Sequence, residues 1–409
     1  MAEVATVQDL IGGGAAAHGG DAAARMGDAA VGGRWRSPAH DHVGCRALQN
    51  EGTGGITPRK NRPRNSSVEN ASPAATSGKL SIVDLESVSR IVSERGAAAQ
   101  LCVIRDGRIV LDRAWGVDRE APFLLFSAGK PLTSMLVHGM AGQGAFALDD
   151  PIARFWPEFG ANGKDGITIR HVLRHRSGLP YAKSVSRDAL LATDWDRSVR
   201  ALARARPHTP PGEVPAYHII SHGFLLGEVV RRVTGAPLTE VFREQLFEPA
   251  GMRRMRLGGA RVPLRGGPMV PRTLFNRRAV RDAVIPAATV SGTARDLALF
   301  YQWLLDEGSW RVATTPTSEG EFDRVSRMAI RWSEGFQLGG LSGERYIGSR
   351  SDSLAFGHNG SNACMGWADP GRRLVVAYLT NRLGGGPARS PHQCAVSDAI
   401  LAAAGASPE

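Results

Sequence analysis

The two ends of this 409-residue chain carry the same elements in opposite order, and this constrains the fold more than any other feature. Near the N-terminal end, apolar residues at helical spacing within 85–92 predict a helix that ends at Gly96. Two apolar runs follow, at 101–104 and 109–115, and the Arg-Asp-Gly sequence between them predicts a β-hairpin.

The C-terminal end has the reverse order of elements. Residues 364–368 and 374–380 are predicted strands around an Asp-Pro-Gly turn, and a final helix follows at about 394–404. A helix and strand pair at one end and a strand pair and helix at the other indicate one antiparallel sheet that contains both ends of the chain.

The stretch between these ends, from about 126 to 345, is mainly helical and rich in loops. Helices are predicted at 128–142, 222–234, 238–250 and 293–306. We therefore predict an α/β (α+β) fold: an antiparallel sheet with flanking helices, plus a mainly helical lobe, with a cleft where the two meet.

Residues 1–78 differ in composition from the rest. They are rich in Ala, Gly, Asn, Ser and Pro, without sustained periodicity, and we expect a disordered tail or a mis-assigned translation start before a folded domain at 79–409. The His40-Asp41-His42 sequence in this tail is interpreted as incidental rather than as a metal site.

A formal net charge of +11 raises the question of nucleic-acid binding. The arginines are scattered, without a long basic run or interleaved aromatic residues, so we expect no nucleic-acid partner. The four cysteines have no zinc spacing, and no run approaches the ~18 apolar residues of a membrane span. Without a signal-peptide pattern at the start, a cytoplasmic location is expected. No metal or organic cofactor is expected either.

Lys130 is conspicuous because this arginine-rich chain has only five lysines. It stands three residues after Ser127, and Ser-x-x-Lys is an arrangement in which a lysine activates a serine nucleophile. Arginine does not lose its proton in proteins, whereas a lysine ammonium is deprotonated when burial or charge lowers its pKa. Pro131 fits only the start of a helix, so Ser127 is predicted at a helix N-terminus. The alternative is an N-cap serine beside a solvated lysine.

Two further segments are candidate parts of a site. Tyr217 follows a Pro/Gly-rich loop and precedes an apolar helix, where a phenol near an amine can exchange a proton with a serine. His218 either orients this tyrosine or bonds a loop carbonyl. His358, Gly360 and Ser361 lie before the C-terminal hairpin, and the glycine lets an edge strand lie close to an acyl group. Core-packing Tyr and His residues are the alternative interpretation.

Together these segments resemble the serine β-lactamase-like superfamily, which joins class C β-lactamases, DD-peptidases, esterases and lipases. The motifs Ser-x-x-Lys, Tyr-x-Asn and Lys-Thr-Gly or His-x-Gly correspond here to Ser127–Lys130, Tyr217-His218-Ile219 and His358-Asn359-Gly360. The similarity runs from about residue 79 to 402 and includes the flanking segments 173–179, 224–228 and 293–297.

The resemblance implies catalysis by Ser127, Lys130 and Tyr217, substrate binding by His218, His358, Gly360 and Ser361, and a β-lactamase/transpeptidase-like fold. The departures favour the esterase branch, because Ile219 replaces Asn and His358 replaces the Lys that engages a substrate carboxylate in penicillin-recognising members. We predict a serine esterase or lipase that cleaves a small-molecule ester through an acyl-enzyme. A β-lactamase or D-amino-acid peptidase, or a non-catalytic binding protein, are the alternatives. The sequence sets no oligomeric state.

Overall fold

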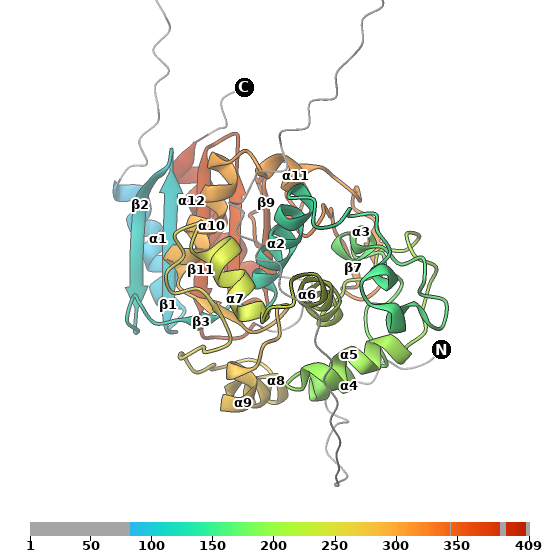
Figure 1. Ribbon diagram of the computed structural model, residues 1–409. Coiled ribbons are helices and arrows are strands. Elements are labelled where there is room, and N and C mark those ends of the chain that lie inside the picture. Colours follow the sequence, from blue (N-terminus) through green and yellow to red (C-terminus); the bar gives the residue numbers. More distant parts are fainter. Residues whose placement is uncertain (1–81, 344, 385–389, 406–409) are drawn as a thin grey trace, which may run out of the picture.

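The computed structural model describes residues 82–343, 345–384 and 390–405 (Figure 1). The predicted tail at 1–78 and the His40-Asp41-His42 sequence lie outside these ranges. The central feature of the described part is a six-stranded antiparallel sheet in the order β2-β1-β11-β10-β9-β8. Its strands are β1 (Ala99–Arg105), β2 (Arg108–Trp115), β8 (Gln337–Leu338), β9 (Phe356–Gly360), β10 (Cys364–Asp369) and β11 (Leu374–Thr380).

The first and last long strands are neighbours in the middle of this sheet. β1 pairs with β11 along its whole length, from Ala99 opposite Thr380 to Arg105 opposite Leu374. Both predicted hairpins are present on either side of this pair. The sheet built from both chain ends, predicted from the mirrored pattern, is thereby confirmed.

Helices cover both faces of the sheet (Figure 1). Helices α1 (Ile82–Glu94) and α12 (Pro391–Ala404) pack on one face, where Leu101 and Val103 of β1 join their core. Cys102 and Ile104 point the other way and join the core that contains α10 (Ala294–Asp306). Because successive side chains of a strand alternate between faces, a sheet covered on both faces buries both sides of its inner strands, and every residue of β11 is buried.

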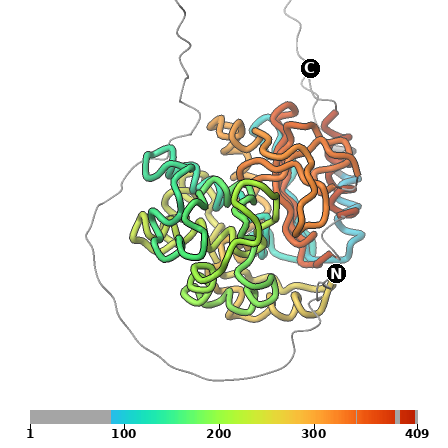
Figure 2. Tube along the Cα trace, turned by 90° about the vertical axis from the view of Figure 1, so that its right-hand side faces the viewer, coloured from blue at the N-terminus to red at the C-terminus, as the bar shows by residue number. Residues whose placement is uncertain are grey.

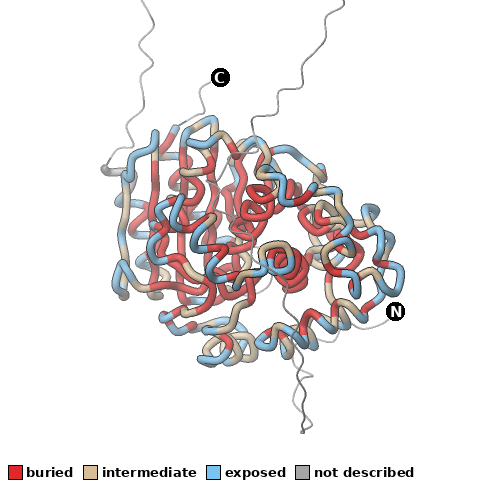
Figure 3. The backbone as a smooth tube through the Cα atoms, viewed as in Figure 1, coloured by how far each residue is buried: buried red, intermediate tan, exposed pale blue. Residues whose placement is uncertain are grey.

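The helical region lies beside the sheet, as the turned view in Figure 2 shows. Helices α2 (Lys130–Gly142) and α6 (Ser221–Thr234) pack against each other, and most of their residues are buried (Figure 3). The shorter helices are α3 (Ile169–Leu173), α4 (Val185–Leu191), α5 (Trp195–Arg204), α7 (Leu238–Phe242), α8 (Met269–Asn276), α9 (Arg278–Asp282) and α11 (Trp310–Thr314). No helix in the described ranges is long and apolar enough to cross a membrane.

Three details differ from the sequence-based expectation. The helix predicted at 238–250 is α7 followed by a π-helical turn at Arg243–Phe247. Helix α10 falls within the predicted lobe but packs on the sheet. A second sheet in the order β3-β5-β4 was not predicted, because its strands have only two or three residues and give no periodicity; they are β3 (Phe123–Leu124), β4 (Arg256–Leu257) and β5 (Val290–Gly292).

Trp367 on β10 tests the packing between the sheet and α12. Its side chain is fully buried and its Nε1 donates a hydrogen bond of 3.1 Å to Ser397 Oγ. We expect Trp367→Ala to lower the free energy of unfolding by about 3–5 kcal/mol in urea titrations. Leu354→Ala, at a side chain that is 44% exposed, is expected to change it by less than about 0.5 kcal/mol. Equal losses in the two variants would contradict this packing.

Candidate active site

Ser127 lies at the junction of the sheet and the helical region. It belongs to a 3₁₀ turn at Phe126–Gly129 that runs directly into α2, where Pro131 occupies the first turn as predicted. Phe126 has a φ of +50°, in the left-handed region that a residue with a Cβ rarely adopts. Such a conformation costs about 1–3 kcal/mol and persists only where the surroundings enforce it. Ser127 is thereby presented partly exposed between buried neighbours.

A close backbone contact holds this turn against the sheet. A Cβ at Gly360 of β9 would lie 2.1 Å from the carbonyl oxygen of Leu125, so a larger residue does not fit there. The next two residues, Ser361 and Asn362, have φ values of +49° and +51° and bend the chain toward the same cavity that Ser127 lines. Gly360 therefore sets the separation between β9 and the serine turn, although it does not itself line the cavity.

Lys130 is fully buried at the start of α2, with its amine beside Ser127. Its Nζ lies 3.0 Å from Ser127 Oγ, 2.8 Å from the carbonyl oxygen of Ile219 and 3.2 Å from that of Ala287. No described carboxylate forms an ion pair with it. Burial therefore lowers the pKa of Lys130 well below its ordinary value, because nothing nearby compensates the charged form.

Tyr217 stands beside the same amine. Its ring centroid is 4.8 Å from Lys130 Nζ, and the ring stacks on Trp332 at 5.5 Å with an interplanar angle of 11°. Burial raises the pKa of the phenol, and the Ser127 hydroxyl offsets a part of that rise. The Oη atom is buried without a well-aligned hydrogen bond to a described residue. Tyr217 therefore faces the serine as a neutral phenol.

A buried aspartate anchors the loop that carries this tyrosine. Asp323 Oδ1 accepts hydrogen bonds from the backbone N–H groups of Tyr217 at 3.1 Å, Val325 at 3.0 Å and Ser326 at 2.7 Å. Sequence analysis missed Asp323 and Trp332, because both come from a loop more than 100 residues away in the chain. No local motif marks either residue.

The predicted substrate-binding residues divide into two groups. His358 and Ser361 line the cavity next to Ser127. His218 does not: its Nε2 lies 2.5 Å from Ser177 Oγ, its Nδ1 lies 2.7 Å from the carbonyl oxygen of Ala216, and its ring is fully buried behind the cavity wall. Its position fits the alternative in which this histidine shapes the Tyr217 loop.

Two more buried histidines surround Lys130 and were not singled out from the sequence. His175, with a φ of +55°, accepts a hydrogen bond from the His218 N–H through Nδ1, and His222 lies 3.3 Å from Ser134 Oγ. Burial lowers the pKa of both imidazoles far below the ordinary value. The core next to the amine is thus built from neutral imidazoles.

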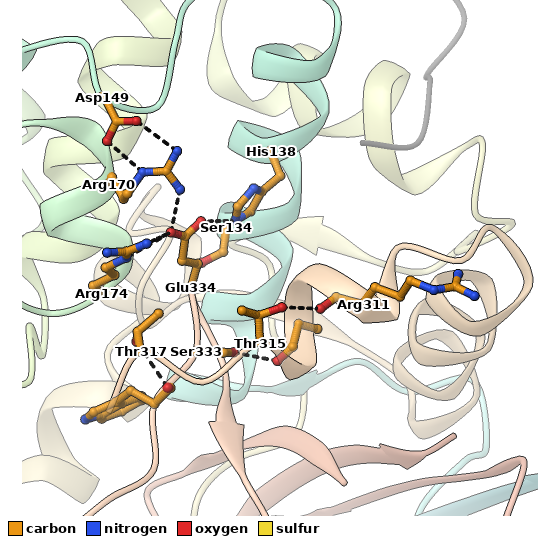
Figure 4. A network of polar contacts seen from close by, with 12 residues as sticks. Ser134, His138, Asp149, Arg170, Arg174, Arg311, Thr315, Thr317, Ser333 and Glu334 are labelled. Carbon is orange, nitrogen blue, oxygen red and sulfur yellow. Dashed lines mark hydrogen bonds and ion pairs between the residues drawn. The ribbon is translucent and has the colours of Figure 1, made fainter. Parts of the chain in front are cut away.

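A polar network beside α2 holds the loop that contains Ser333 and Glu334, next to Trp332 in the sequence (Figure 4). The buried Glu334 accepts hydrogen bonds from Arg170 Nη1 at 2.6 Å and Arg174 Nε at 2.9 Å, and its Oε2 lies 3.6 Å from His138 Nε2 on α2. A Cβ at the adjacent Gly335 would lie 2.2 Å from Ser134 Oγ. This loop therefore packs directly on the helix that begins with Lys130.

One cavity of about 490 Å³ opens onto Ser127, Tyr217, His358 and Ser361. Its size suits a small molecule. Residues of helix α8 and of the segments 325–341 and 345–347 supply other parts of its wall, together with Leu383, Gly384 and Ser390. No group of three potential metal ligands occurs among the residues that the structure describes.

Ser127 thus has a lysine amine, rather than an imidazole, beside its hydroxyl. The family model described as Beta-lactamase matches residues 88–397, and the chain belongs to this family. The resemblance inferred from the motifs is thereby confirmed, and the protein is a serine hydrolase of the beta-lactamase family.

Esterases are among its relatives. Esterase/beta-lactamase LipL from Mycobacterium tuberculosis is 29% identical over 351 residues, which are 72% of this chain and 79% of LipL. Esterase EstB from Burkholderia gladioli is 35% identical over 184 residues, 39% of this chain and only 46% of EstB. Two solved structures share the fold. A family VIII carboxylesterase has a TM-score of 0.68 and 24% identity, and the match covers 78% of this chain and 97% of that one. EstA from Arthrobacter nitroguajacolicus has a TM-score of 0.67 and 22% identity, and the match covers 80% of this chain and 97% of that one.

Glu334 tests whether the polar network supports the site. Glu334→Gln weakens two ion pairs at a buried position, and we expect the free energy of unfolding to fall by about 1–3 kcal/mol. Glu248→Gln removes the exposed pair with Arg243 (2.7 Å), which solvent screens, and is expected to leave the free energy of unfolding nearly unchanged. Urea titrations of both variants check this, and equal effects would show that the Glu334 network adds nothing to an ordinary surface pair.

The buried histidines predict how stability depends on pH. In the fold, burial lowers the pKa of His218 to about 4 and that of His358 to about 3, from an unfolded value of 6.5. Below pH 6.5 the unfolded chain binds protons that the folded imidazoles do not bind, so stability falls by about 1.4 kcal/mol per pH unit for each such histidine until the folded pKa is reached. Urea midpoints at pH 7.5, 6 and 5 measure this slope. A free energy of unfolding that stays constant over this range would refute it.

Proposed function

We propose that the protein hydrolyses carboxylic esters through an acyl-enzyme on Ser127, with Lys130 as the base. The observation that carries this proposal is the set of contacts around Lys130 Nζ. A neutral amine has two N–H donors and one lone pair. The carbonyls of Ile219 and Ala287 accept the two N–H groups, and the lone pair is left to accept the Ser127 hydroxyl proton at 3.0 Å.

In the first half of the reaction, Ser127 Oγ attacks the ester carbonyl and its proton passes to Lys130 Nζ. The tetrahedral oxyanion is bound by backbone amides, those of Ser127 and of a residue near Ser361 in the related proteins' pattern. Tyr217 gives its proton to the departing alcohol and regains one from Lys130, whose Nζ lies 4.8 Å from the ring centre. In the second half, water replaces the alcohol and the same groups run in reverse, which releases the acid and restores Ser127.

Two observations favour an ester over a β-lactam or a peptide. His358 occupies the position where penicillin-recognising members have a lysine, and burial lowers its pKa to about 3, so it carries no fixed charge at neutral pH. LipL and EstB are both named esterases. LipL is also named a β-lactamase, so β-lactam hydrolysis is the second candidate, and turnover of a chromogenic cephalosporin relative to p-nitrophenyl butyrate decides between them.

Labelling by a fluorophosphonate tests the nucleophile. We expect one adduct per wild-type chain by intact mass, no adduct in Ser127→Ala, and a loss of at least about 1000-fold in labelling rate in Lys130→Arg, since a guanidinium does not accept the proton. Lys183→Arg, the same change at an exposed position, is the matched control and should label normally. A folded wild type that forms no adduct and cleaves no ester would favour a non-catalytic binding protein instead.

A further inference from the structure

The charged side chains on the cavity wall are all cationic among the described residues. Among the described residues that line it, the formally charged ones are Arg331 and Arg345, and none is an aspartate or glutamate. A substrate with an ammonium group near these walls gains no partner and meets like charge. An anionic group meets a cationic wall in a partly apolar cavity, where charge attraction is stronger than in water.

The two arginines are not equivalent. The Nε of Arg331 pairs with Glu319 at 2.9 Å, and its Nη1 donates to the carbonyls of Gly339 at 2.7 Å and Ser353 at 3.1 Å. Arg331 therefore uses these donors to hold the segments of the cavity wall together. Arg345 donates one hydrogen bond of 3.0 Å to the carbonyl of Ala329, and no described carboxylate pairs with it. Its side chain is half-buried, and most of its N–H donors remain available to a bound molecule.

Tyr346 adds a second, independent sign of a missing partner. Its side chain is only 6% exposed and lines the same cavity, and its Oη is buried without a hydrogen-bond partner among the described residues. Burial raises the pKa of this phenol, so it remains a proton donor at neutral pH. Buried polar groups nearly always have a partner, and the Tyr346 hydroxyl, on a residue that lines the cavity, is free to donate to a molecule bound there.

We propose that this cavity selects esters that carry an anionic group, such as a carboxylate, away from the scissile bond, with Arg345 pairing with the anion and Tyr346 donating a hydrogen bond to it. This inference rests on the proposed esterase function and names its substrate class. The same cavity is lined by apolar residues that can accommodate the linking chain, among them Met328, Ile330, Leu338 and Ile347.

Matched pairs of esters test the proposal. On the acyl side, p-nitrophenyl hemisuccinate is compared with its methyl ester, which has the same chain without the charge. On the alcohol side, 3-carboxyphenyl butyrate is compared with its methyl ester. We expect the wild type to have a higher kcat/KM for the anionic member of at least one pair.

The variants then locate the charge recognition. A hydrogen-bonded charge pair of this kind is worth about 10- to 100-fold in binding, so Arg345→Met should raise KM for the preferred anionic ester by that factor and change its neutral partner less than about twofold. Tyr346→Phe should show a smaller effect of the same sign. Arg350→Met, at an exposed residue outside the cavity wall, is the matched control.

Failure of this inference and failure of the esterase function are distinguishable. Neutral esters that are cleaved with no preference for either anionic ester, or an Arg345→Met effect equal on charged and neutral members, would overturn the anion site while leaving the esterase intact. Isothermal titration calorimetry of Ser127→Ala with monoethyl succinate and with diethyl succinate measures binding to the cavity without turnover. Tighter binding of the monoester that is lost in Ser127→Ala/Arg345→Met supports it whatever the catalytic outcome.

Discussion

The pairing of β1 with β11 is the interaction on which the rest of the structure depends. It joins residues 99 and 380, so almost the whole described chain is a loop closed by one pair of strands. The chain-length-dependent part of that closure costs about 5 kcal/mol in entropy, a sum that burial of a few large side chains offsets. Both faces of the pair are covered by helices, which supplies this burial. The serine turn and β9 then meet because each is connected to the same rigid sheet.

Burial, rather than a neighbouring charge, lowers the pKa of Lys130. A carboxylate beside Lys130 would stabilise the ammonium and keep the amine protonated. The structure surrounds this side chain instead with two carbonyls, a serine hydroxyl, aromatic rings and neutral histidines. Burying an amine without a counter-charge lowers the stability of the fold. Polar contacts outside the site act in the opposite direction: Asp323 holds the loop of Tyr217, and Glu334 holds the loop of Trp332.

Much of this was readable from the sequence because it depends on local patterns. Two hairpins and their adjoining helices have strong periodicity and turn residues, and the position of Pro131 fixed the start of α2 and with it the place of Ser127. The same local reasoning failed where contacts are distant. His218 follows Tyr217 directly, yet its buried ring contacts Ser177 and does not line the cavity. Trp332, Asp323 and Arg345 come from loops without periodicity, and only the folded chain brings them to the site.

Ile219 illustrates how one position carries two separate functions. Its carbonyl oxygen holds Lys130 at 2.8 Å, while its side chain lines the cavity. The backbone contact is the same for any side chain that preserves the local conformation, so the loss of the asparagine found in related enzymes leaves the contact with the amine in place. Substitutions at this one codon, natural or in a directed library, can therefore change the shape of the cavity without altering the backbone contact to Lys130. A motif search that requires asparagine at this position overlooks proteins that keep this contact.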